Sequence, residues 1–391
     1  MRILIGHNFQ QFSGGEDRAV EADRELLAAH GHETRLYSRN YDEVASRAGL
    51  TRLSLAGEAV WSRTSYAAIR ALIREWRPHV AHFHNIFPLI SASAYYACRA
   101  EGVPVVQTLH NYRLVCAAGT LLRDGKVCEL CVGRAPWPAV RYRCYRGSRA
   151  QSVAMATALG GHGAAGTWRT RVDAYIALTE FARKIFARGG LPEDRLFIRP
   201  NAVATREPLE YLGPHSAIFA GRLSPEKGIT TLLDAWERLP DIPLLLVGGG
   251  PLLSQIQRRI SEPKLRHVTV TGELPHSRVL ELIGRAGMLI FPSVCYEGLP
   301  YVALEALAEG VPVIASDIGT QAEIVSNDVS GLLFRTGDAE SLVDAVTMLR
   351  GREGLAARLA QGARRDFNER YSLEQSYTLL MQIYRAIGAQ D

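Results

Sequence analysis

The 391-residue chain lacks the segments that mark membrane and secreted proteins. No apolar run reaches the roughly 18 residues of a membrane-spanning helix, and the apolar, glycine-rich stretch from Val153 to Gly166 is interrupted by His162. The N-terminal sequence, Met1-Arg-Ile-Leu-Ile-Gly-His, turns polar too early for the apolar core of a secretory signal. We therefore expect a cytoplasmic protein, with the inner face of the membrane as an alternative location.

The chain also lacks the G-x-G-x-x-G fingerprint after its first predicted strand, which argues against a dehydrogenase. Its 47% of hydrophobic and 22% of charged residues are typical of a globular protein rather than a disordered one. The length is too great for one ordinary core and suits two domains of roughly 150–200 residues each.

Charge is unevenly distributed along the chain. Residues 1–200 carry 27 Lys and Arg against 17 Asp and Glu, whereas residues 201–391 carry 18 against 23. A basic first half suggests an anionic partner, such as a phospholipid surface or a lipid-linked phosphate. Arginines scattered over the surface are the alternative explanation.

Short runs rich in Val, Ile and Leu recur, most of them followed by an amphipathic stretch, which predicts βαβ units and parallel sheets. The expected strands are 2–7, 33–37, 80–84, 105–110, 174–178 and 196–199 in the first half, and 217–221, 244–247, 268–271, 288–291, 313–315 and 331–334 in the second. We expect doubly wound domains at 1–200 and 201–370, a joint near 200–214, and a C-terminal helix in 371–391. Ligands of such sheets bind beyond the carboxyl ends of the strands, so the cleft between domains is the expected active site.

The first strand is followed by Gly14-Gly15 and a helical run to about Ala29. Paired glycines at this position allow backbone N–H groups to approach an anion at the helix N-terminus. A tight strand-to-helix turn explains the same residues without a ligand.

The second half has more specific patterns after its strands. Arg222 and Lys227 lie in Gly-Arg-Leu-Ser-Pro-Glu-Lys-Gly, where two cations before a helix can hold a diphosphate. Glu297 and Glu305 flank another strand-to-helix connection, where carboxylates can accept hydrogen bonds from sugar or ribose hydroxyls. The alternative for Arg222 and Lys227 is a pair of surface cations without a ligand. The alternative for the two glutamates is a solvent-exposed helix face.

Taken in order, these motifs resemble those of family 4 glycosyltransferases from about residue 1 to 385. The resemblance rests on Gly14-Gly15, on His110 after a strand, on 221–228, on the E-x7-E pair Glu297/Glu305, and on the Gly-Val-Pro-Val-Ile-Ala-Ser and Gly-Leu-Leu-Phe segments. It implies an α/β GT-B fold, in which two Rossmann-like doubly wound domains face across a cleft and C-terminal helices cross back to the first domain. It also implies retaining transfer of a hexose-type sugar from a nucleoside-diphosphate sugar to a hydroxyl acceptor, in bacterial polysaccharide or glycoconjugate biosynthesis.

The resemblance assigns the donor diphosphate to Arg222 and Lys227, which stabilise the leaving group. Glu297 would contact hydroxyls of the donor sugar, with backbone donors from Gly298 and Leu299. Because the sequence has no strict Asp-x-Asp, the motif that holds a divalent ion in metal-dependent transferases, we expect no catalytic metal and assign charge neutralisation to the two cations.

By the same resemblance, Glu305 would hold the ribose and the segment Thr271-Gly272 would lie near the base. Gly14 and Gly15 would bring N–H groups to the diphosphate. His110 would orient the donor sugar and assist at the transition state, although a histidine at a strand end is also a common structural residue.

The sequence is compatible with other functions. One is transfer to a small-molecule acceptor, and another is a non-catalytic subunit that binds sugar nucleotides. A glycosidase would need two carboxylates at a set distance on either side of the scissile bond, which sequence spacing cannot show, and nothing in the sequence favours it over a transferase. His82 and His84 alternate onto one side of a strand, where a metal site, an acceptor-side loop or a packed interior would each account for them.

Four of the six cysteines fall in the segment 111–149, in a C-x11-C-x2-C-x12-C pattern. In a cytoplasmic protein, Cys116, Cys128, Cys131 and Cys144 favour a structural zinc site over an iron–sulfur cluster or free thiols. The segment is also rich in arginine and aromatic residues, and we expect an acceptor platform for a glycan or lipid phosphate, with possible peripheral membrane association. A nucleic-acid partner is not expected, because nothing else in the chain supports one.

Overall fold

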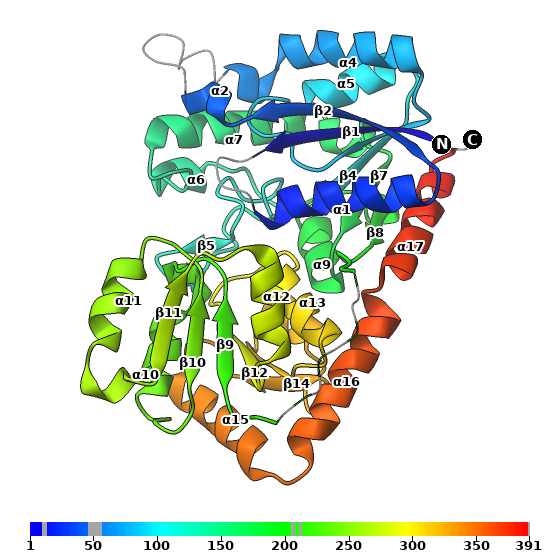
Figure 1. Cartoon of the computed structure of the whole chain (residues 1–391). Helices are drawn as coiled ribbons and strands as arrows, with labels where there is room; N and C mark the ends of the chain where they lie inside the picture. The colour runs from blue at the N-terminus through cyan, green and yellow to red at the C-terminus, as the bar shows by residue number, and fades with distance from the viewer. Residues whose placement is uncertain are drawn as a thin grey trace. The chain divides into compact units, whose positions relative to one another are not determined.

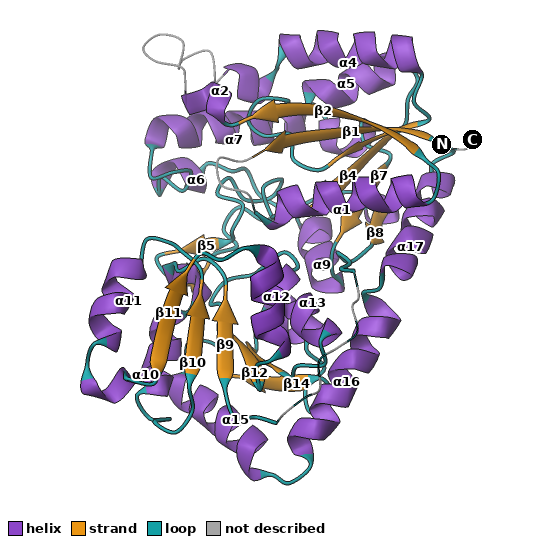
Figure 2. Cartoon of the chain, viewed as in Figure 1, coloured by secondary structure: helices purple, strands orange, loops and turns teal. Residues whose placement is uncertain are grey.

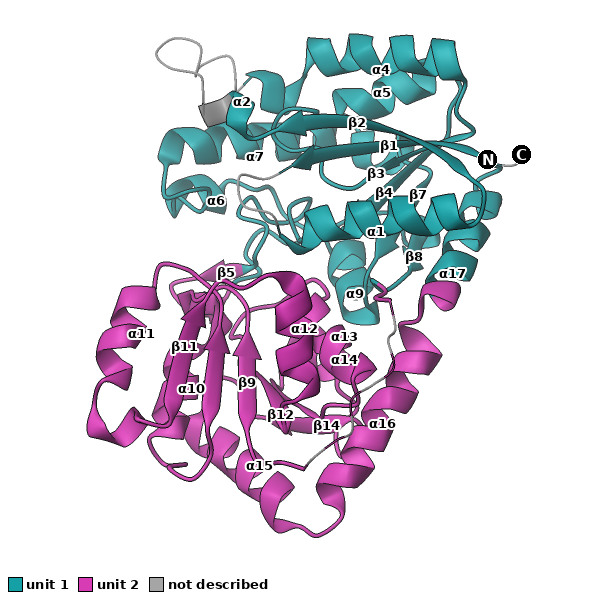
Figure 3. Cartoon of the chain, viewed as in Figure 1, with its two compact units in different colours: residues 1–121, 128–201, 376–391 teal, residues 122–127, 202–375 magenta. Residues whose placement is uncertain are grey.

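The computed structural model describes residues 1–9, 14–45, 57–204, 207, 209, 211 and 213–389. The chain divides into two compact units (Figure 3). Unit 1 comprises Met1–Leu121, Cys128–Asn201 and Ser376–Asp391, and unit 2 comprises Leu122–Val127 and Ala202–Gln375. Each unit contains a parallel six-stranded sheet with helices on both sides, as Figure 2 shows.

The sheet of unit 1 has the strand order β2-β1-β3-β4-β7-β8. Its strands are β1 (Arg2–Phe9), β2 (Glu33–Asn40), β3 (Val80–Phe83), β4 (Val105–Leu109), β7 (Ala174–Ala177) and β8 (Leu196–Ile198). Its helices are α1 (Gly15–Ala29), α2 (Asp42–Ala45), α4 (Arg63–Trp76), α5 (Ser93–Ala100), α6 (Pro138–Arg141), α7 (Arg149–Ala164), α8 (Thr167–Thr170) and α9 (Glu180–Arg188).

The C-terminal helix α17 (Leu373–Ala386) completes the core of unit 1. Leu380 and Tyr384 of this helix are fully buried in the same cluster as Ile3 and Ile5 of β1. The helix, red in Figure 1, thus returns the end of the chain to the sheet that starts it.

The sheet of unit 2 has the strand order β11-β10-β9-β12-β13-β14. Its strands are β9 (Ala217–Ala220), β10 (Leu244–Val247), β11 (Val268–Gly272), β12 (Met288–Phe291), β13 (Val313–Ser316) and β14 (Gly331–Phe334). Its helices are α10 (Ile229–Trp236), α11 (Leu253–Ile260), α12 (His276–Gly284), α13 (Tyr301–Ala308), α14 (Gly319–Ile324), α15 (Ala339–Gly351) and α16 (Leu355–Arg370).

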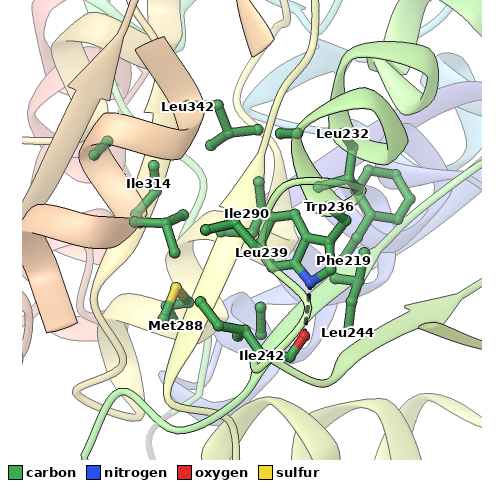
Figure 4. Packing of buried hydrophobic residues seen from close by; sticks show 14 of the residues in the cluster. Phe219, Leu232, Trp236, Leu239, Ile242, Leu244, Met288, Ile290, Ile314 and Leu342 are labelled. Atoms are coloured by element: carbon green, nitrogen blue, oxygen red, sulfur yellow. Dashed lines mark hydrogen bonds between the residues drawn. The ribbon is translucent and has the colours of Figure 1, made fainter. Parts of the chain in front are cut away.

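Trp236 lies at the centre of the unit 2 core, packed among Phe219, Leu232 and Ile290 (Figure 4). Its indole N–H donates a hydrogen bond to the carbonyl of Ile242 at 2.9 Å, so the buried donor is satisfied. Such a core holds β9 and β12 rigidly, and these two strands carry the loops described below.

The twelve predicted strands are all confirmed, and β1 and β2 extend two and three residues beyond their predicted ends. The doubly wound fold class is likewise confirmed. The segment that interrupts the alternation contains a two-stranded hairpin, β5 (Leu122–Arg123) and β6 (Lys126–Val127), followed by the single-turn helix α6. Among the helices that the structure describes, none combines the length and the hydropathy that a membrane span requires.

Candidate functional site

The strand order of unit 2 reverses between β9 and β12, which are hydrogen-bonded neighbours. At such a switch point the chain leaves the two strands toward opposite sides of the sheet, and ligands of doubly wound folds bind beyond the carboxyl ends of these strands. These two loops carry the residues predicted to contact the diphosphate and the donor sugar.

At Gly228, the loop after β9 packs directly against the loop after β12. It ends the 3₁₀ turn η2 (Pro225–Lys227) with a φ of 71°, and it caps the N-terminus of α10. A Cβ atom here would lie 1.9 Å from the carbonyl oxygen of Pro292, which follows β12. Only glycine allows this approach, and it brings Lys227 over the second loop.

Lys227 and Glu297 form an ion pair at this point, with the Lys227 Nζ atom 2.6 Å from Glu297 Oε1. Their side chains are 23% and 14% exposed, so both charges are partly shielded from water. Burial acts to lower the pKa of Lys227, but the charge and hydrogen bond of Glu297 outweigh it and raise that pKa. The lysine is therefore a fixed cation at the switch point.

Arg222 lies exposed directly beyond β9. Within the described part of the chain, its guanidinium has no ion-pair partner. Two cations of different kinds thus stand beside the same strand end: a paired lysine and an arginine free to bind an anion through two parallel hydrogen bonds.

The loop after β12 is fastened to α14 by two hydrogen bonds. The Thr320 hydroxyl donates to the Glu297 carbonyl at 3.0 Å, and the Gln321 amide donates to the Cys295 carbonyl at 2.9 Å. Gly298 is half-buried and Leu299 is buried. These contacts hold the loop in one conformation, although sequence reasoning did not identify Thr320 or Gln321.

Glu305 lies on α13 and is only 4% exposed. The alternative interpretation, in which Glu305 belongs to a solvent-exposed helix face, is therefore wrong. Its Oε1 atom is 2.8 Å from His276 Nε2, at the first residue of α12. His276 was not predicted, because a histidine that begins a helix has no local pattern that marks it as a site residue. Thr271 and Gly272 end β11, where the Thr271 hydroxyl donates to the Gly272 carbonyl at 2.9 Å.

A turn of three glycines follows β10 and packs against the Arg222 loop. A Cβ atom on Gly248 would lie 2.0 Å from the Gly221 carbonyl oxygen, and one on Gly250 would lie 2.5 Å from that of Leu223. Both glycines have positive φ. The run Gly248-Gly-Gly250 directly after a strand could have predicted this third loop, but it was not among the predicted site motifs.

His110 belongs to unit 1, directly after β4, and its ring stacks on that of His84 with centroids 5.2 Å apart. Burial lowers the pKa of His110 to about 4, so the ring is neutral at pH 7. With Asn111 and Arg113 it lines a pocket of unit 1. The Asn111 amide donates a short hydrogen bond to Glu16 in the first turn of α1.

Gly14 and Gly15 stand at the N-terminus of α1, as predicted. The Gly14 N–H donates to Asp17 Oδ2 at 3.3 Å, and a Cβ atom on Gly14 would meet nothing within 4 Å. Residues 10–13, which precede this pair, lie outside the described residues.

Asp23, His82 and His84 have donor atoms within 4.8 Å of one another, but they do not form an open metal site. Both oxygens of Asp23 accept hydrogen bonds from Arg199, and both ring nitrogens of His82 are bonded, to Tyr384 and Thr108. Of the alternatives for His82, the packed interior is confirmed, since its side chain is fully buried.

Cys116, Cys128 and Cys144 all lie close enough to Cys131 to affect the pKa of its thiol. Burial, followed by these neighbouring thiols, raises the pKa of Cys131 to about 11. No disulfide joins them. Over the described ranges, no three of these sulfurs lie within 4.8 Å of one another, so a closed thiolate site would require them to move closer.

Comparison with known proteins matches both units to transferase families. Residues 13–207 match the family described as Glycosyltransferase Family 4, and residues 204–366 match the family described as Glycosyl transferases group 1.

Two curated relatives show how far the similarity extends. The exopolysaccharide phosphotransferase SCO2592 of Streptomyces coelicolor is 35% identical over 191 residues, which cover 47% of this chain and 20% of the relative. The O-antigen chain mannosyltransferase C of Escherichia coli is 29% identical over 180 residues, covering 46% of this chain and 48% of the relative. The matched region thus spans no more than about half the length of either relative.

The fold is shared with solved structures over the whole chain. HepE from Anabaena in complex with UDP matches with a TM-score of 0.69 and 16% identity, covering 100% of both chains. At this identity the match shows the fold, which is that of GT-B glycosyltransferases. Both family matches and the two doubly wound sheets lead to one assignment: the chain belongs to the family 4 glycosyltransferases of the GT-B fold.

Proposed function

We propose that the protein transfers a hexose-type sugar from a nucleoside-diphosphate sugar to a hydroxyl acceptor, with retention of configuration and without a catalytic metal. The observation that carries the proposal is the placement of Arg222 and the Lys227–Glu297 pair at the switch point of unit 2. HepE, which shares the fold, has been solved with UDP-glucose, and this supports a nucleotide-sugar donor.

In the proposed reaction, Arg222 and Lys227 contact the diphosphate. Negative charge develops on it as the bond to the sugar breaks, and cations already in place stabilise that charge without reorganisation. The Glu297 carboxylate, held by Lys227, accepts hydrogen bonds from hydroxyls of the donor sugar. The N–H groups of Gly298 and Leu299 bind the same end of the donor.

The nucleoside end of the donor is assigned to Glu305 and to Thr271-Gly272. His276 holds the Glu305 carboxylate in place, and in the proposal this carboxylate accepts hydrogen bonds from the ribose hydroxyls. Gly14 and Gly15 donate N–H groups to the diphosphate, and His110 contacts the donor sugar. The acceptor belongs to polysaccharide or glycoconjugate assembly, and a small-molecule hydroxyl is the alternative.

Nucleotide binding and turnover test this proposal directly. A ligand at about 100 times its Kd adds about 2.7 kcal/mol of stability, so UDP, GDP, ADP and dTDP sugars can be compared by thermal shift. We expect one base to stand out, Arg222→Ala to abolish its shift, and Arg350→Ala, an exposed cation on α15, to leave it intact. A chain that binds the donor but never hydrolyses or transfers it would be a non-catalytic subunit.

Two further measurements address stereochemistry and metal. NMR of the transferred sugar should show the anomeric configuration of the donor, and activity should persist in EDTA. Inverted product or activity restored only by a divalent cation would contradict the corresponding part of the proposal.

The arginine-rich segment 111–149 is assigned to an anionic, lipid-linked acceptor. Arg113 lines the pocket beside His110, while Trp137 and Tyr142 are 57% and 44% exposed. Cationic side chains with exposed aromatic rings bind anionic membrane surfaces. We expect binding to phosphatidylglycerol vesicles over phosphatidylcholine vesicles, lost in Trp137→Ala and retained in the exposed control Trp61→Ala. Binding to neither vesicle would favour a small-molecule acceptor.

The four-cysteine pattern is assigned to one structural zinc ion, with Cys116, Cys128, Cys131 and Cys144 as its ligands. Zinc would cross-link a segment whose regular structure, within the described residues, is limited to a short hairpin and one helical turn. We expect about one zinc per chain by metal analysis, lost in Cys131→Ser and kept in Cys295→Ser. Wild-type protein with no bound metal and four freely titrating thiols would contradict this assignment.

A further inference from the structure

Three histidine rings lie in a row in unit 1, and two of them, His84 and His110, line its pocket. His82 and His84, at the carboxyl end of β3, have ring centroids 4.5 Å apart, and His84 stacks in turn on His110 after β4. The Nδ1 atom of His84 lies 2.9 Å from Nε2 of His110, which makes a hydrogen bond between the two rings. His84 is 3% exposed, so water does not compete for this bond.

Asp23 stands on the other side of His84. The carboxyl Oδ2 atom lies 3.8 Å from His84 Nε2, and within the described part of the chain that nitrogen has no hydrogen-bond partner. Burial acts to raise the pKa of Asp23, but the charge and hydrogen bonds of Arg199 outweigh it and lower that pKa. The carboxylate therefore remains a fixed negative charge facing His84.

Both rings of the His84–His110 pair are neutral at pH 7. Burial lowers the pKa of His84 well below its usual value and that of His110 to about 4. One ring must therefore donate its only N–H to the other. The other titratable or charged groups that interact with His110 come from α1, β1 and the end of β8: Glu16, Asp23, His7 and Arg199.

Either His84 or His110 can donate the hydrogen bond between the two rings. The choice decides whether His84 Nε2 faces Asp23 with a lone pair or with a proton. If His84 donates from Nδ1, its Nε2 lone pair faces the carboxylate, which is repulsive. If His110 donates from Nε2, the proton of His84 is on Nε2 and faces the carboxylate, which is attractive. The second arrangement also turns the buried Nε2 of His84 into a donor for which an acceptor stands nearby.

We propose that Asp23, acting through His84, holds His110 in the tautomer protonated at Nε2, so that His110 Nδ1 accepts a hydrogen bond from a hydroxyl of the donor sugar. The proposal rests on the proposed function for the identity of that hydroxyl. Asp23 and His84 are positioning residues: they set which nitrogen of His110 is an acceptor, as a carboxylate sets the tautomer of a catalytic histidine in hydrolases. His110 lines the pocket, and its Nδ1 has no hydrogen bond within the described residues.

The tautomer can be measured without any substrate. In ¹⁵N-histidine-labelled protein, two-bond ¹H–¹⁵N correlations distinguish Nε2–H from Nδ1–H rings, and the signals of His110 are identified by their loss in His110→Asn. We expect the Nε2–H form in the wild type and a mixture in His84→Phe, which keeps the stacked ring and removes the hydrogen bond. An Nδ1–H ring in the wild type would overturn the proposal whatever the enzyme's activity.

Kinetics then separate positioning from structure. We expect His84→Phe to lower kcat by about 10–100-fold with little change in KM, which is the range for loss of a partner that orients a metal-ligating imidazole. His84→Asn, whose amide can accept from His110 and donate toward Asp23, should recover part of that loss. His162→Phe removes another buried histidine of unit 1 and should leave kcat unchanged.

The outcomes distinguish this proposal from the function on which it rests. Wild-type kcat in His84→Phe would overturn the positioning role even if the tautomer is as expected. A wild-type protein that neither binds nor turns over any sugar nucleotide would refute the proposed function, whereas the tautomer would still be read by NMR.

Discussion

Lys227 Nζ lies 2.6 Å from Glu297 Oε1, although the two residues are 70 positions apart in the chain. The pair forms because β9 and β12 are neighbours and because Gly228 lets one loop pass directly over the other. The cation that the diphosphate would meet is thus charged and in place before any ligand arrives, which is the condition for electrostatic stabilisation of a leaving group.

Lys227→Ala should lower kcat by about 10²–10³-fold, because it removes a main donor to the leaving diphosphate. The measurement is donor turnover at saturating acceptor, with Lys264→Ala as the control for loss of an exposed lysine of unit 2. Turnover within twofold of the wild type would remove Lys227 from the proposed machinery.

Glu305→Gln should abolish the discrimination between ribose and 2′-deoxyribose nucleotides. The buried carboxylate, held by His276, accepts hydrogen bonds more strongly than a neutral amide does, and one such bond is worth about 1.5–3 kcal/mol, or roughly tenfold or more in Kd. Calorimetry with the ribonucleotide and its 2′-deoxy analogue checks this. Equal loss of affinity for both ligands would indicate that Glu305 supports the loop instead.

Stability should decline as the pH falls from about 6.5 toward 4. Burial lowers the pKa of His110 to about 4 and that of His82 to about 3, so in this range the unfolded chain takes up protons that the folded chain refuses. Each such histidine can cost up to about 2 kcal/mol between pH 7 and pH 5. Asp23, whose folded pKa is lowered, loses its stabilising effect only at still lower pH.

Urea unfolding at pH 7 and pH 5 measures this loss. The pH dependence should be smaller in His110→Asn, which removes one of the groups that the unfolded chain protonates. Identical unfolding midpoints at the two pH values in the wild type would contradict the expectation.

Gly228→Ala should destabilise the protein much more than Gly14→Ala. At Gly228, a φ of 71° and a Cβ atom 1.9 Å from the Pro292 carbonyl predict a loss of at least about 1–3 kcal/mol. At Gly14, φ is −130° and a Cβ atom meets nothing within 4 Å, so the loss should be limited to the roughly 1 kcal/mol or less by which alanine is worse than glycine at a helix N-cap. If Gly14→Ala nevertheless weakens donor binding, the glycine serves a ligand, because the fold does not require it.

Much of the fold of this protein can be predicted from local patterns in the sequence. The alternation of apolar runs and amphipathic stretches predicted twelve strands, since strand and helix periodicities are properties of a few consecutive residues. Because parallel strands all end at the same edge of a sheet, the sequence alone predicts that the motifs containing Arg222, Lys227 and Glu297 lie near one another.

The residues that form hydrogen bonds and ion pairs with those motifs could be identified only from the tertiary structure. His276 reaches Glu305 across 29 residues, and Arg199 reaches Asp23 across 176, so no window of sequence contains either pair. Whether a titratable group is neutral is decided in the same way, because burial and neighbouring charges come from distant elements. The sequence by itself determined the two sheets and the residues at their edges, whereas packing alone determined that His110 rests on His84 and that His84 faces a carboxylate held charged by Arg199.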